Sequence, residues 1–220
     1  MPTVDIWTGD LDVPAGEVEG LERYLDAEEL ARAERFRFAR DRRRFVVRRG
    51  LLRERLGRVV AEAPERLVFT VGPWGKPALR DHRCRFSLSH SHERMALAIS
   101  DVEVGCDIER IDEELDWSPI AAEAFEATDL NELALLEPTE ARVAFFRCWT
   151  RMEARLKAEG HGFAQSNYPI SPPRGKADLS WHVSDADTPP GYALAVAAAR
   201  HTTPCRVRTR HLQRAEPACR

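Results

Sequence analysis

Residues 104–109 read Val-Gly-Cys-Asp-Ile-Glu, and this stretch carries the strongest local prediction of both fold and chemistry. Small or apolar residues alternate with the carboxylates of Asp107 and Glu109, which is the period of a β-strand with one buried face. The two carboxylates therefore project from one side of the strand, while Cys106 and Ile108 point into the opposite layer. Gly105 allows a neighbouring backbone or a ligand to approach closely.

The carboxylate pair of this strand is a candidate metal site. Asp107 and Glu109 repel one another unless a cation lies between them, and a site with oxygen ligands alone favours Mg²⁺ or Mn²⁺. The alternative interpretation is an exposed strand face with two solvated acids, because Asp-x-Glu is a common sequence. The residues alone leave both interpretations open.

The segments on either side predict an α+β fold. A helical pattern covers residues 21–60, and further helices are expected at 119–136 and 140–159. Strands are expected at 67–71, 85–91, 95–100 and 102–108, and a hairpin at 179–183 and 192–199. A long helix followed by strands thus occurs twice, which suggests two similar α+β halves that meet near residue 105. The arginine-rich tail, residues 201–220, is expected to form an edge strand followed by a mobile end.

Composition sets the broad class of the protein. The chain has 220 residues, of which 43% are apolar and 31% charged, so we expect one large or two small globular domains. Five cysteines without a Cys-x-x-Cys pair argue against a disulfide scaffold or a zinc ribbon and favour a reducing compartment. No apolar run approaches the ~20 residues that span a bilayer, and the acidic start does not resemble a signal peptide. We therefore expect a cytoplasmic protein without a membrane partner.

Charge is balanced overall but locally segregated. Residues 32–58 contain 12 arginines against three acids, whereas residues 101–140 contain 14 acids against one arginine. A fold that brings these segments together would form a cleft with a cationic and an acidic wall, which suits an anionic ligand held through a divalent metal. The alternatives are two solvated helix faces, or an arginine-rich helix that binds nucleic acid. A net charge of −3 and the lack of an aromatic RNA-binding pattern count against nucleic acid.

The helix expected at 140–159 carries a second candidate group. Glu153 and Lys157 lie one turn apart on one face, where a carboxylate and an ammonium can hold a metal ion and its phosphate ligand together. A pair with this spacing is equally an ordinary surface ion pair. An apolar stripe occupies the neighbouring face and consists of Phe145, Trp149, Met152 and Leu156.

Two further segments offer groups that bind anions. Ser89, His90 and Ser91 come at the end of an expected strand, where hydroxyl and imidazole groups can donate hydrogen bonds. A Ser–His hydrolase is the rival interpretation, but the Gly-x-Ser-x-Gly pattern is absent. Lys76 and Pro77 lie in a loop rich in Gly and Pro that offers a phosphate contact but lacks the Walker pattern for ATP.

The order and spacing of these motifs resemble the 4′-phosphopantetheinyl transferases, specifically the two-halved, surfactin-synthetase-activating type. The match covers roughly residues 30–163. Four motifs occur in the family's order: 75–77 (Gly-Lys-Pro), 86–91 (Phe-Ser-Leu-Ser-His-Ser), 104–109, and 149–154 (Trp-Thr-Arg-Met-Glu-Ala) followed by Lys157 and by Gly-His-Gly at 160–162.

This resemblance implies two similar α+β halves in a pseudo-twofold arrangement, with the active site in the cleft between them. Residues 1–104 would form the half that binds the nucleotide of coenzyme A, and residues 105–220 the half with the metal and the catalytic helix. The implied reaction moves 4′-phosphopantetheine from coenzyme A to a serine of an acyl or peptidyl carrier protein and releases adenosine 3′,5′-bisphosphate. Mg²⁺ is the implied metal, with Mn²⁺ as a substitute. We expect a monomer, since two halves in one chain complete the cleft.

The resemblance also implies roles for single residues. Asp107, Glu109 and Glu153 would bind the metal, and Glu153 is also the candidate base for the carrier serine. Ser89 and His90 would bind the 3′-phosphate of coenzyme A, and Lys157 would meet the pyrophosphate. The remaining expected cofactor contacts are Lys76, Pro77 and Arg44. The expected catalytic residues are therefore Glu153, Lys157 and Asp107.

One departure from the family lies in the active-site helix. Met152 stands where the family most often has lysine, and we expect its thioether at the edge of the cleft without a catalytic role. This departure leaves open a relative that binds coenzyme A or a nucleotide without catalysis. Asp129 is similar to an acid that the family places near the active site, on a looser match.

Overall fold

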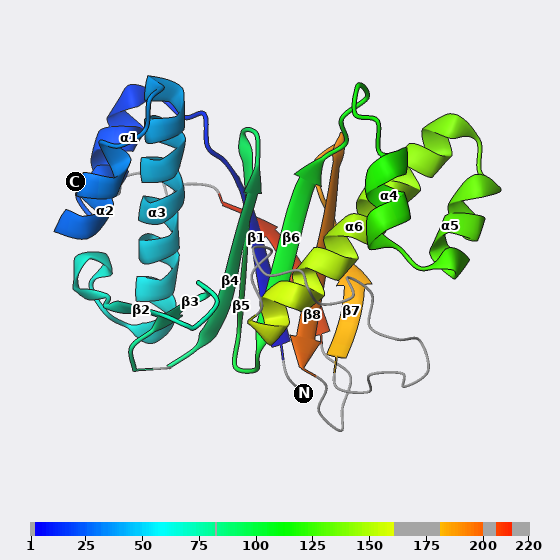
Figure 1. Cartoon of the computed structure of the whole chain (residues 1–220). Helices are drawn as coiled ribbons and strands as arrows, with labels where there is room; N and C mark the ends of the chain where they lie inside the picture. The colour runs from blue at the N-terminus through cyan, green and yellow to red at the C-terminus, as the bar shows by residue number, and fades with distance from the viewer. Residues whose placement is uncertain (1–2, 82, 161–180, 200–205, 213–220) are drawn as a thin grey trace.

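The computed structural model describes residues 3–81, 83–160, 181–199 and 206–212, and it has the predicted α+β character (Figure 1). The described strands form a four-stranded sheet in the order β4-β5-β1-β9, a three-stranded sheet in the order β6-β8-β7 and the small hairpin β2-β3. Their bounds are β1 Thr3–Asp10, β2 Phe69–Val71, β3 Pro77–Leu79, β4 Arg85–Ser91, β5 Arg94–Ser100, β6 Val104–Arg110, β7 Trp181–Asp185, β8 Tyr192–Ala199 and β9 Arg206–His211.

Helices gather on two sides of this strand layer. The first three lie beside the four-stranded sheet, and α6 crosses the three-stranded sheet, with α4 and α5 beyond it (Figure 1). Their bounds are α1 Ala15–Glu22, α2 Ala27–Ala33, α3 Ala39–Val60, α4 Ser118–Ala124, α5 Ala127–Ala134 and α6 Pro138–Glu159, and a 3₁₀ turn, η1, covers Pro64–Arg66.

The edge strands β4 and β6 lie side by side at the centre of the molecule, although they belong to different sheets (Figure 1). A buried apolar cluster beneath them takes Val4 and Ile6 from one sheet and Cys106, Ile108 and Leu194 from the other. The prediction that Cys106 and Ile108 point away from the carboxylates is therefore confirmed. Because one core serves both sheets, the β4–β6 seam is held in a fixed register.

The prediction of one continuous helix over residues 21–60 is wrong. The chain forms three helices there, and each break has a local cause. Asp26 begins α2 as a capping box, accepting a hydrogen bond from the Glu29 backbone N–H while the Glu29 carboxylate accepts one from the Asp26 backbone N–H. Phe38 has extended backbone angles before α3, and Ala61 ends α3 in the left-handed conformation.

The helix predicted over 119–136 is also two helices in the structure. Phe125 has extended backbone angles between α4 and α5. Its ring lies 5.5 Å from that of Phe145, centroid to centroid, so the aromatic contact sets the break.

Two strands escaped the sequence analysis. One is β1, in which Val4 and Ile6 alternate with half-buried residues and which lies in the interior of its sheet, between β5 and β9. The other is β3, which begins at Pro77, the last residue of the loop expected at 72–77 from its Gly and Pro content. The edge strand expected in the tail is confirmed as β9, which pairs in parallel with β1, whereas the expected mobile end lies outside the described residues.

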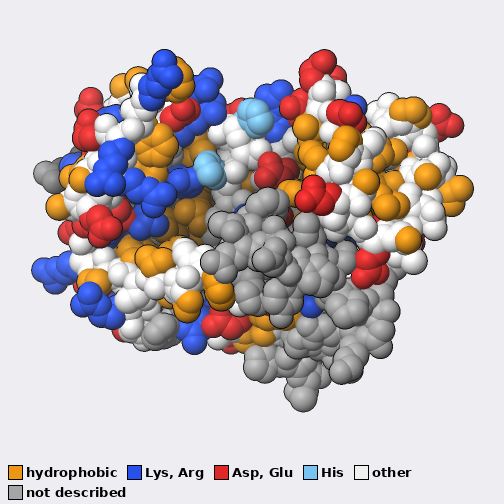
Figure 2. Space-filling view, in the orientation of Figure 1, with side chains coloured by type: hydrophobic (Ala, Val, Ile, Leu, Met, Phe, Trp, Pro, Cys, Tyr) orange, Lys and Arg blue, Asp and Glu red, His pale blue; other side chains and the backbone are white. Residues whose placement is uncertain are grey.

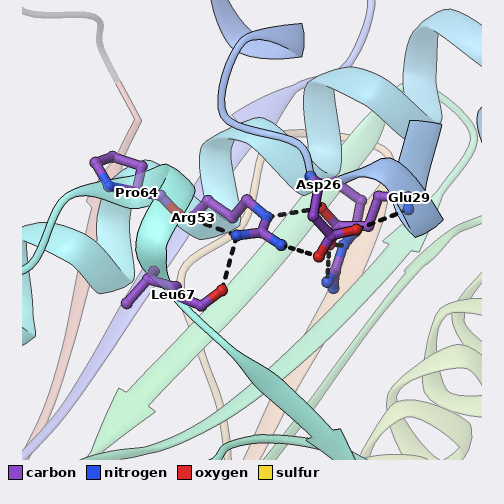
Figure 3. Close-up of polar contacts among 6 residues, drawn as sticks. Asp26, Glu29, Arg53, Pro64 and Leu67 are labelled. Atoms are coloured by element: carbon purple, nitrogen blue, oxygen red, sulfur yellow. Dashed lines mark hydrogen bonds and ion pairs between the residues drawn. The ribbon is translucent and has the colours of Figure 1, made fainter.

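The buried guanidinium of Arg53 fastens α2 to α3 (Figure 3). Arg53 is 0% exposed and donates hydrogen bonds to Glu29 (2.6 Å), to Asp26 (2.5 Å) and to the carbonyls of Pro64 and Leu67. The same Glu29 carboxylate accepts hydrogen bonds from Arg49. A buried charge is tolerated only with partners of this number, so the network fixes α2 against the face of α3.

Helix α6 lies unusually close to β6, and Gly105 is the reason. A Cβ atom on Gly105 would stand 1.9 Å from the Ala154 carbonyl oxygen and 2.3 Å from the Ala158 nitrogen. The buried residues of α6 on this side include Thr150, Ala154 and Ala158. The apolar stripe predicted for α6 packs largely away from this contact: Phe145 stacks on Trp117, just before α4, and meets Phe125 between α4 and α5, while Trp149 contacts Phe145.

Candidate active site

A pocket of about 550 Å³ lies where α3 and β4 face β6 and α6. One wall is cationic and the other carries carboxylates, as the segregated charges of the sequence predicted. Figure 2 shows the same division on the surface, with Lys and Arg side chains gathered over α1–α3 and Asp and Glu side chains prominent on the α4–α5 side. The lining residues are Arg32, Phe45, Arg48, Arg49, Pro77, Leu88, Ser89, His90, Asp107, Glu109, Trp149, Glu153 and Lys157.

Three carboxylates occupy the acidic wall. Asp107 and Glu109 extend from β6, and Glu153 faces them from α6. Burial and the neighbouring Asp107 charge raise the pKa of Glu109 to about 7. Burial likewise raises the pKa of Glu153 to about 7, against the opposing effect of Lys157. Like charges held together out of water are costly, so this wall favours the binding of protons or of a cation.

Lys157 is the cation that the protein itself supplies to this wall. Its Nζ donates to Asp107 Oδ1 at 2.5 Å and to Ser89 Oγ at 2.9 Å. Burial opposes its charge, but the charge and hydrogen bond of Asp107 outweigh burial, so the pKa of Lys157 lies above its usual value. Lys157 is therefore charged at neutral pH and holds one side of the carboxylate group.

The carboxylates suit a hard divalent cation by their chemistry. The oxygens Asp107 Oδ2 and Glu153 Oε1 are buried and have no hydrogen-bond partner among the described residues. A missing cation leaves oxygens of this kind, and a donor set of oxygens alone is typical of Mg²⁺. In the described part of the chain, however, no three acidic, His or Cys side chains are close enough to form a ready-made metal cluster. The residues fit the metal, and side-chain movement or ligand oxygens must complete its shell.

On the cationic wall, Arg48 differs from its neighbour Arg49. Arg49 forms an ion pair with Glu29. Arg48 forms no ion pair with any described carboxylate, and its buried Nε has no hydrogen-bond partner among the described residues. Burial, together with the positive charges of Arg49 and Arg32, lowers the pKa of Arg48 to about 10. The guanidiniums of Arg32 and Arg48 lie 5.4 and 5.7 Å from the ring centroid of Phe45. Two cations that repel one another beside a pocket form a surface that attracts an anion.

Ser89 and His90 both reach the pocket, but in different ways. The Ser89 hydroxyl donates to Asp107 Oδ1 at 2.7 Å and accepts from Lys157, so it belongs to the acidic wall. His90 remains partly exposed on the cationic side. Partial burial and the charges of Arg48, Lys157 and Arg44 lower the pKa of His90, so the ring is neutral at pH 7 and can offer one N–H donor.

Two expected cofactor contacts do not line this pocket. Arg44 lies on α3 one turn before Arg48, but its guanidinium binds both carboxylate oxygens of Asp12, at 2.7 and 2.5 Å. Lys76 Nζ donates to the carbonyls of Val104 (3.0 Å) and Ala158 (3.1 Å), where it ties the hairpin loop to the end of α6. Pro77 does line the pocket. A direct contact of Arg44 or Lys76 with a cofactor stays a prediction.

Met152 and Asp129 are also absent from the pocket lining. Met152 is half-buried and belongs to none of the apolar clusters formed by the described residues. Arg32, Phe45 and Arg48 line the pocket although they were not predicted as site residues. Their signal was the density of arginine in 32–58, which marks the segment but not the side chains that turn toward the pocket.

A cationic wall opposite a carboxylate wall is an arrangement that suits a phosphate-bearing ligand together with a divalent cation. Comparison with known proteins is more specific. Residues 103–207 match the family model of the 4′-phosphopantetheinyl transferase superfamily. The chain is 35% identical over 167 residues to the 4′-phosphopantetheinyl transferase HetI of Nostoc sp., covering 74% of this chain and 70% of that protein.

Two relatives from Bacillus carry the same family name. The identity is 35% over 150 residues to the 4′-phosphopantetheinyl transferase psf-1 of Bacillus pumilus, covering 67% of this chain and 63% of the relative. It is 27% over 205 residues to a 4′-phosphopantetheinyl transferase of Bacillus subtilis, covering 86% and 89%. The chain belongs to the 4′-phosphopantetheinyl transferase family, and the resemblance found in the sequence is confirmed. Its predicted enzyme class is confirmed with it.

The structure also bears on two predictions from composition. None of the helices in the described ranges combines the length and the apolar character that a membrane span requires. Cys84, Cys106 and Cys148 are free thiols, and Cys205 and Cys219 lie outside the described residues.

Proposed function

We propose that this protein transfers 4′-phosphopantetheine from coenzyme A to a serine of an acyl or peptidyl carrier protein and releases adenosine 3′,5′-bisphosphate. The observation that carries the proposal is the pocket itself. It brings the guanidinium of Arg48, which forms no ion pair with a described residue, into one cavity with the three carboxylates and Lys157. Family membership supplies the reaction class, and this charge arrangement suits a substrate with several phosphates.

In the proposed reaction a bond forms between the serine oxygen and a phosphorus of the pyrophosphate, and the bond from that phosphorus to the leaving bisphosphate breaks. Attack at phosphorus depends mainly on positioning and charge neutralisation. Mg²⁺, when bound by Asp107, Glu109 and Glu153, would neutralise charge on the pyrophosphate. Lys157 would add a fixed positive charge, and Glu153 would accept the serine proton.

We assign the 3′-phosphate of coenzyme A to the cationic wall. His90 would donate one hydrogen bond to this phosphate, as the sequence predicted, and Arg48 would supply the charge. This role for Arg48 is supported by its unpaired, partly desolvated guanidinium, whereas Arg44 is already paired with Asp12. Ser89 would act from the acidic wall through Asp107 and Lys157.

Two similar halves in a pseudo-twofold arrangement remain part of the proposal. The support is that α3 and α6, each of 22 residues, pack beside strands on the two sides of the pocket. The proposed halves are 1–104 and 105–220, although β9 returns from the second to pair with β1 of the first. We further propose a monomer, since residues from both proposed halves of one chain line the pocket, and we propose that it acts in the cytoplasm.

The direct test is to incubate the protein with coenzyme A, Mg²⁺ and a panel of carrier domains lacking the prosthetic group, and to measure the mass of each carrier. We expect a gain equal to one phosphopantetheine on at least one carrier, and loss of that gain with chelator or with Asp107→Asn. Full transfer in excess chelator would contradict the metal assignment. Binding of coenzyme A with no mass gain on any carrier would favour the non-catalytic relative instead.

A further inference from the structure

Three serines of β4 span the seam between the two sheets. Ser87, Ser89 and Ser91 occupy alternate positions of the strand, so all three face β6, and they are only 5%, 6% and 9% exposed. β4 and β6 are not paired as neighbours in one sheet. The serine hydroxyls therefore make polar contacts across the seam where backbone pairing is missing.

Each hydroxyl meets a different group of β6. Ser87 Oγ accepts a hydrogen bond from the Cys106 backbone N–H at 3.0 Å. Ser89 Oγ donates to Asp107 at 2.7 Å. Ser91 Oγ donates to Glu109 Oε2 at 2.7 Å and accepts from the Arg110 backbone N–H at 3.2 Å. The first contact is to backbone alone, while the other two reach the carboxylates that we assign to the metal.

The Ser91 contact fixes the direction of the Glu109 side chain. The Ser91 hydroxyl accepts from the Arg110 N–H and lies 3.4 Å from His92 Nδ1, but its much shorter contact, 2.7 Å to a carboxylate oxygen, directs its proton to Glu109 Oε2. No other hydrogen bond to the Glu109 carboxylate is formed by the described residues. One oxygen is thereby held against the strand, and the second, Oε1, is left for another partner in the pocket. Ordering a glutamate side chain in advance removes a cost that metal binding would otherwise have to offset.

We infer that Ser91 is a positioning residue, which holds Glu109 in the orientation needed to bind the divalent cation. This inference rests on the proposed function, and it adds a residue that does not itself touch metal or substrate. It predicts that loss of the Ser91 hydroxyl weakens metal binding even when the fold and the other two carboxylates are intact.

The experiment compares two serines of the same strand by Mn²⁺ binding, measured from the electron paramagnetic resonance signal of free Mn²⁺ with and without coenzyme A. We expect Ser91→Ala to weaken Mn²⁺ binding on the order of tenfold, as is typical when a group that orients a ligand is lost. Ser91→Thr, which keeps the hydroxyl, should restore most of the affinity. Ser87→Ala is the matched control, since it removes a buried seam hydroxyl that touches no carboxylate.

The outcomes separate the two proposals. Equal weakening of Mn²⁺ binding in Ser87→Ala and Ser91→Ala would overturn the positioning role, because any buried hydroxyl of the seam would then have the same effect. Unchanged Mn²⁺ affinity in Ser91→Ala would also overturn it, because the Ser91 hydroxyl would then make no contribution. A melting temperature for each variant shows whether the fold is kept. If the unmodified protein itself binds no Mn²⁺ with or without coenzyme A, the metal proposal fails, and the role of Ser91 fails with it.

Discussion

Replacing Arg48 by methionine should stabilise the ligand-free protein and weaken its binding of coenzyme A. The two expected effects have one cause. Arg48 is a cation that the fold leaves without a partner among the described residues, and a bound phosphate is the partner we propose for it. Methionine keeps an unbranched apolar stem beside Phe45 but removes the charge.

The stability effect follows from the lowered pKa. Folding lowers the pKa of Arg48 from its usual value to about 10, so the charged form is less favourable in the folded than in the unfolded protein. The resulting penalty is complete below pH 10 and fades as the pH rises above it. Each pKa unit corresponds to about 1.4 kcal/mol, and allowing for solvent screening we expect a gain of about 1–3 kcal/mol in Arg48→Met. For a chain of this size that is a rise of about 2–12 °C in melting temperature.

The binding effect has the opposite sign. A hydrogen bond between charged groups contributes about 1.5–3 kcal/mol, so coenzyme A should bind about 10- to 150-fold more weakly to Arg48→Met. Dephospho-coenzyme A, which lacks the 3′-phosphate, should bind both proteins alike. Isothermal titration with the two cofactors, with Mg²⁺ present, measures this difference, and thermal unfolding without ligand measures stability.

Arg40→Met is the matched control for this experiment. It removes the same charge from the same helix, at an exposed position whose ion pair is with the neighbouring Asp41. We expect little change in either measurement. A lower melting temperature in Arg48→Met would show that its charge is satisfied in the fold, and an undiminished preference for coenzyme A over dephospho-coenzyme A would show that another group binds the 3′-phosphate. Either result refutes this reasoning.

Three further predictions concern other parts of the site. Folding raises the pKa values of Glu109 and Glu153 from 4.5 to about 7, so the stability of the ligand-free protein should fall as the pH rises from 5 to 8, while Mn²⁺ binding strengthens. Glu153→Gln should flatten both pH profiles, and unchanged slopes in this variant would count against the raised pKa values. Gly105→Ala should lower the melting temperature by more than about 6 °C, because its Cβ would meet the backbone of α6 and a clash of this kind costs about 3 kcal/mol, whereas Gly16→Ala, with open space around its Cβ, serves as control. Met152→Lys should fold normally and keep the single-turnover transfer rate, since Met152 is half-buried and lies outside both the pocket and the described apolar clusters. A marked fall in melting temperature would show instead that Met152 packs in the core.

Two parts of the acidic wall could be predicted from sequence because their geometry is local, whereas the meeting of Glu153 with Asp107 and Glu109 was implied only by the family resemblance. Alternation along 104–109 places Asp107 and Glu109 on one face, and helical spacing places Glu153 one turn from Lys157. The close approach allowed by Gly105 was also predicted, and the structure shows the approaching group to be the backbone of α6. Such features depend on strand and helix periods that hold in any tertiary setting.

The cationic wall could not be predicted in the same way, because its chemistry depends on distant partners. Arg44 and Arg48 are one turn apart and equivalent in sequence. Asp12 neutralises the first from a separate segment, whereas no described carboxylate reaches the second. Lys76 is similar, since its ammonium binds the carbonyl of Val104 at the start of β6 and that of Ala158 near the end of α6, where the helix dipole favours a cation. Which arginine is left for a ligand is decided by tertiary pairing.

The two walls together also restrict how ligands can enter the pocket. A phosphate-rich ligand alone meets the attraction of Arg48 but also the repulsion of Asp107 and Glu153. A divalent cation alone satisfies those carboxylates but meets the positive charges of Lys157 and Arg48. When both are present, each ligand neutralises the wall that repels the other, so their binding free energies must be coupled. Linkage is reciprocal, so Mg²⁺ should tighten coenzyme A by the same factor by which coenzyme A tightens Mg²⁺. The charges that the ligand-free pocket leaves unpaired therefore favour metal and cofactor as a pair over either one alone.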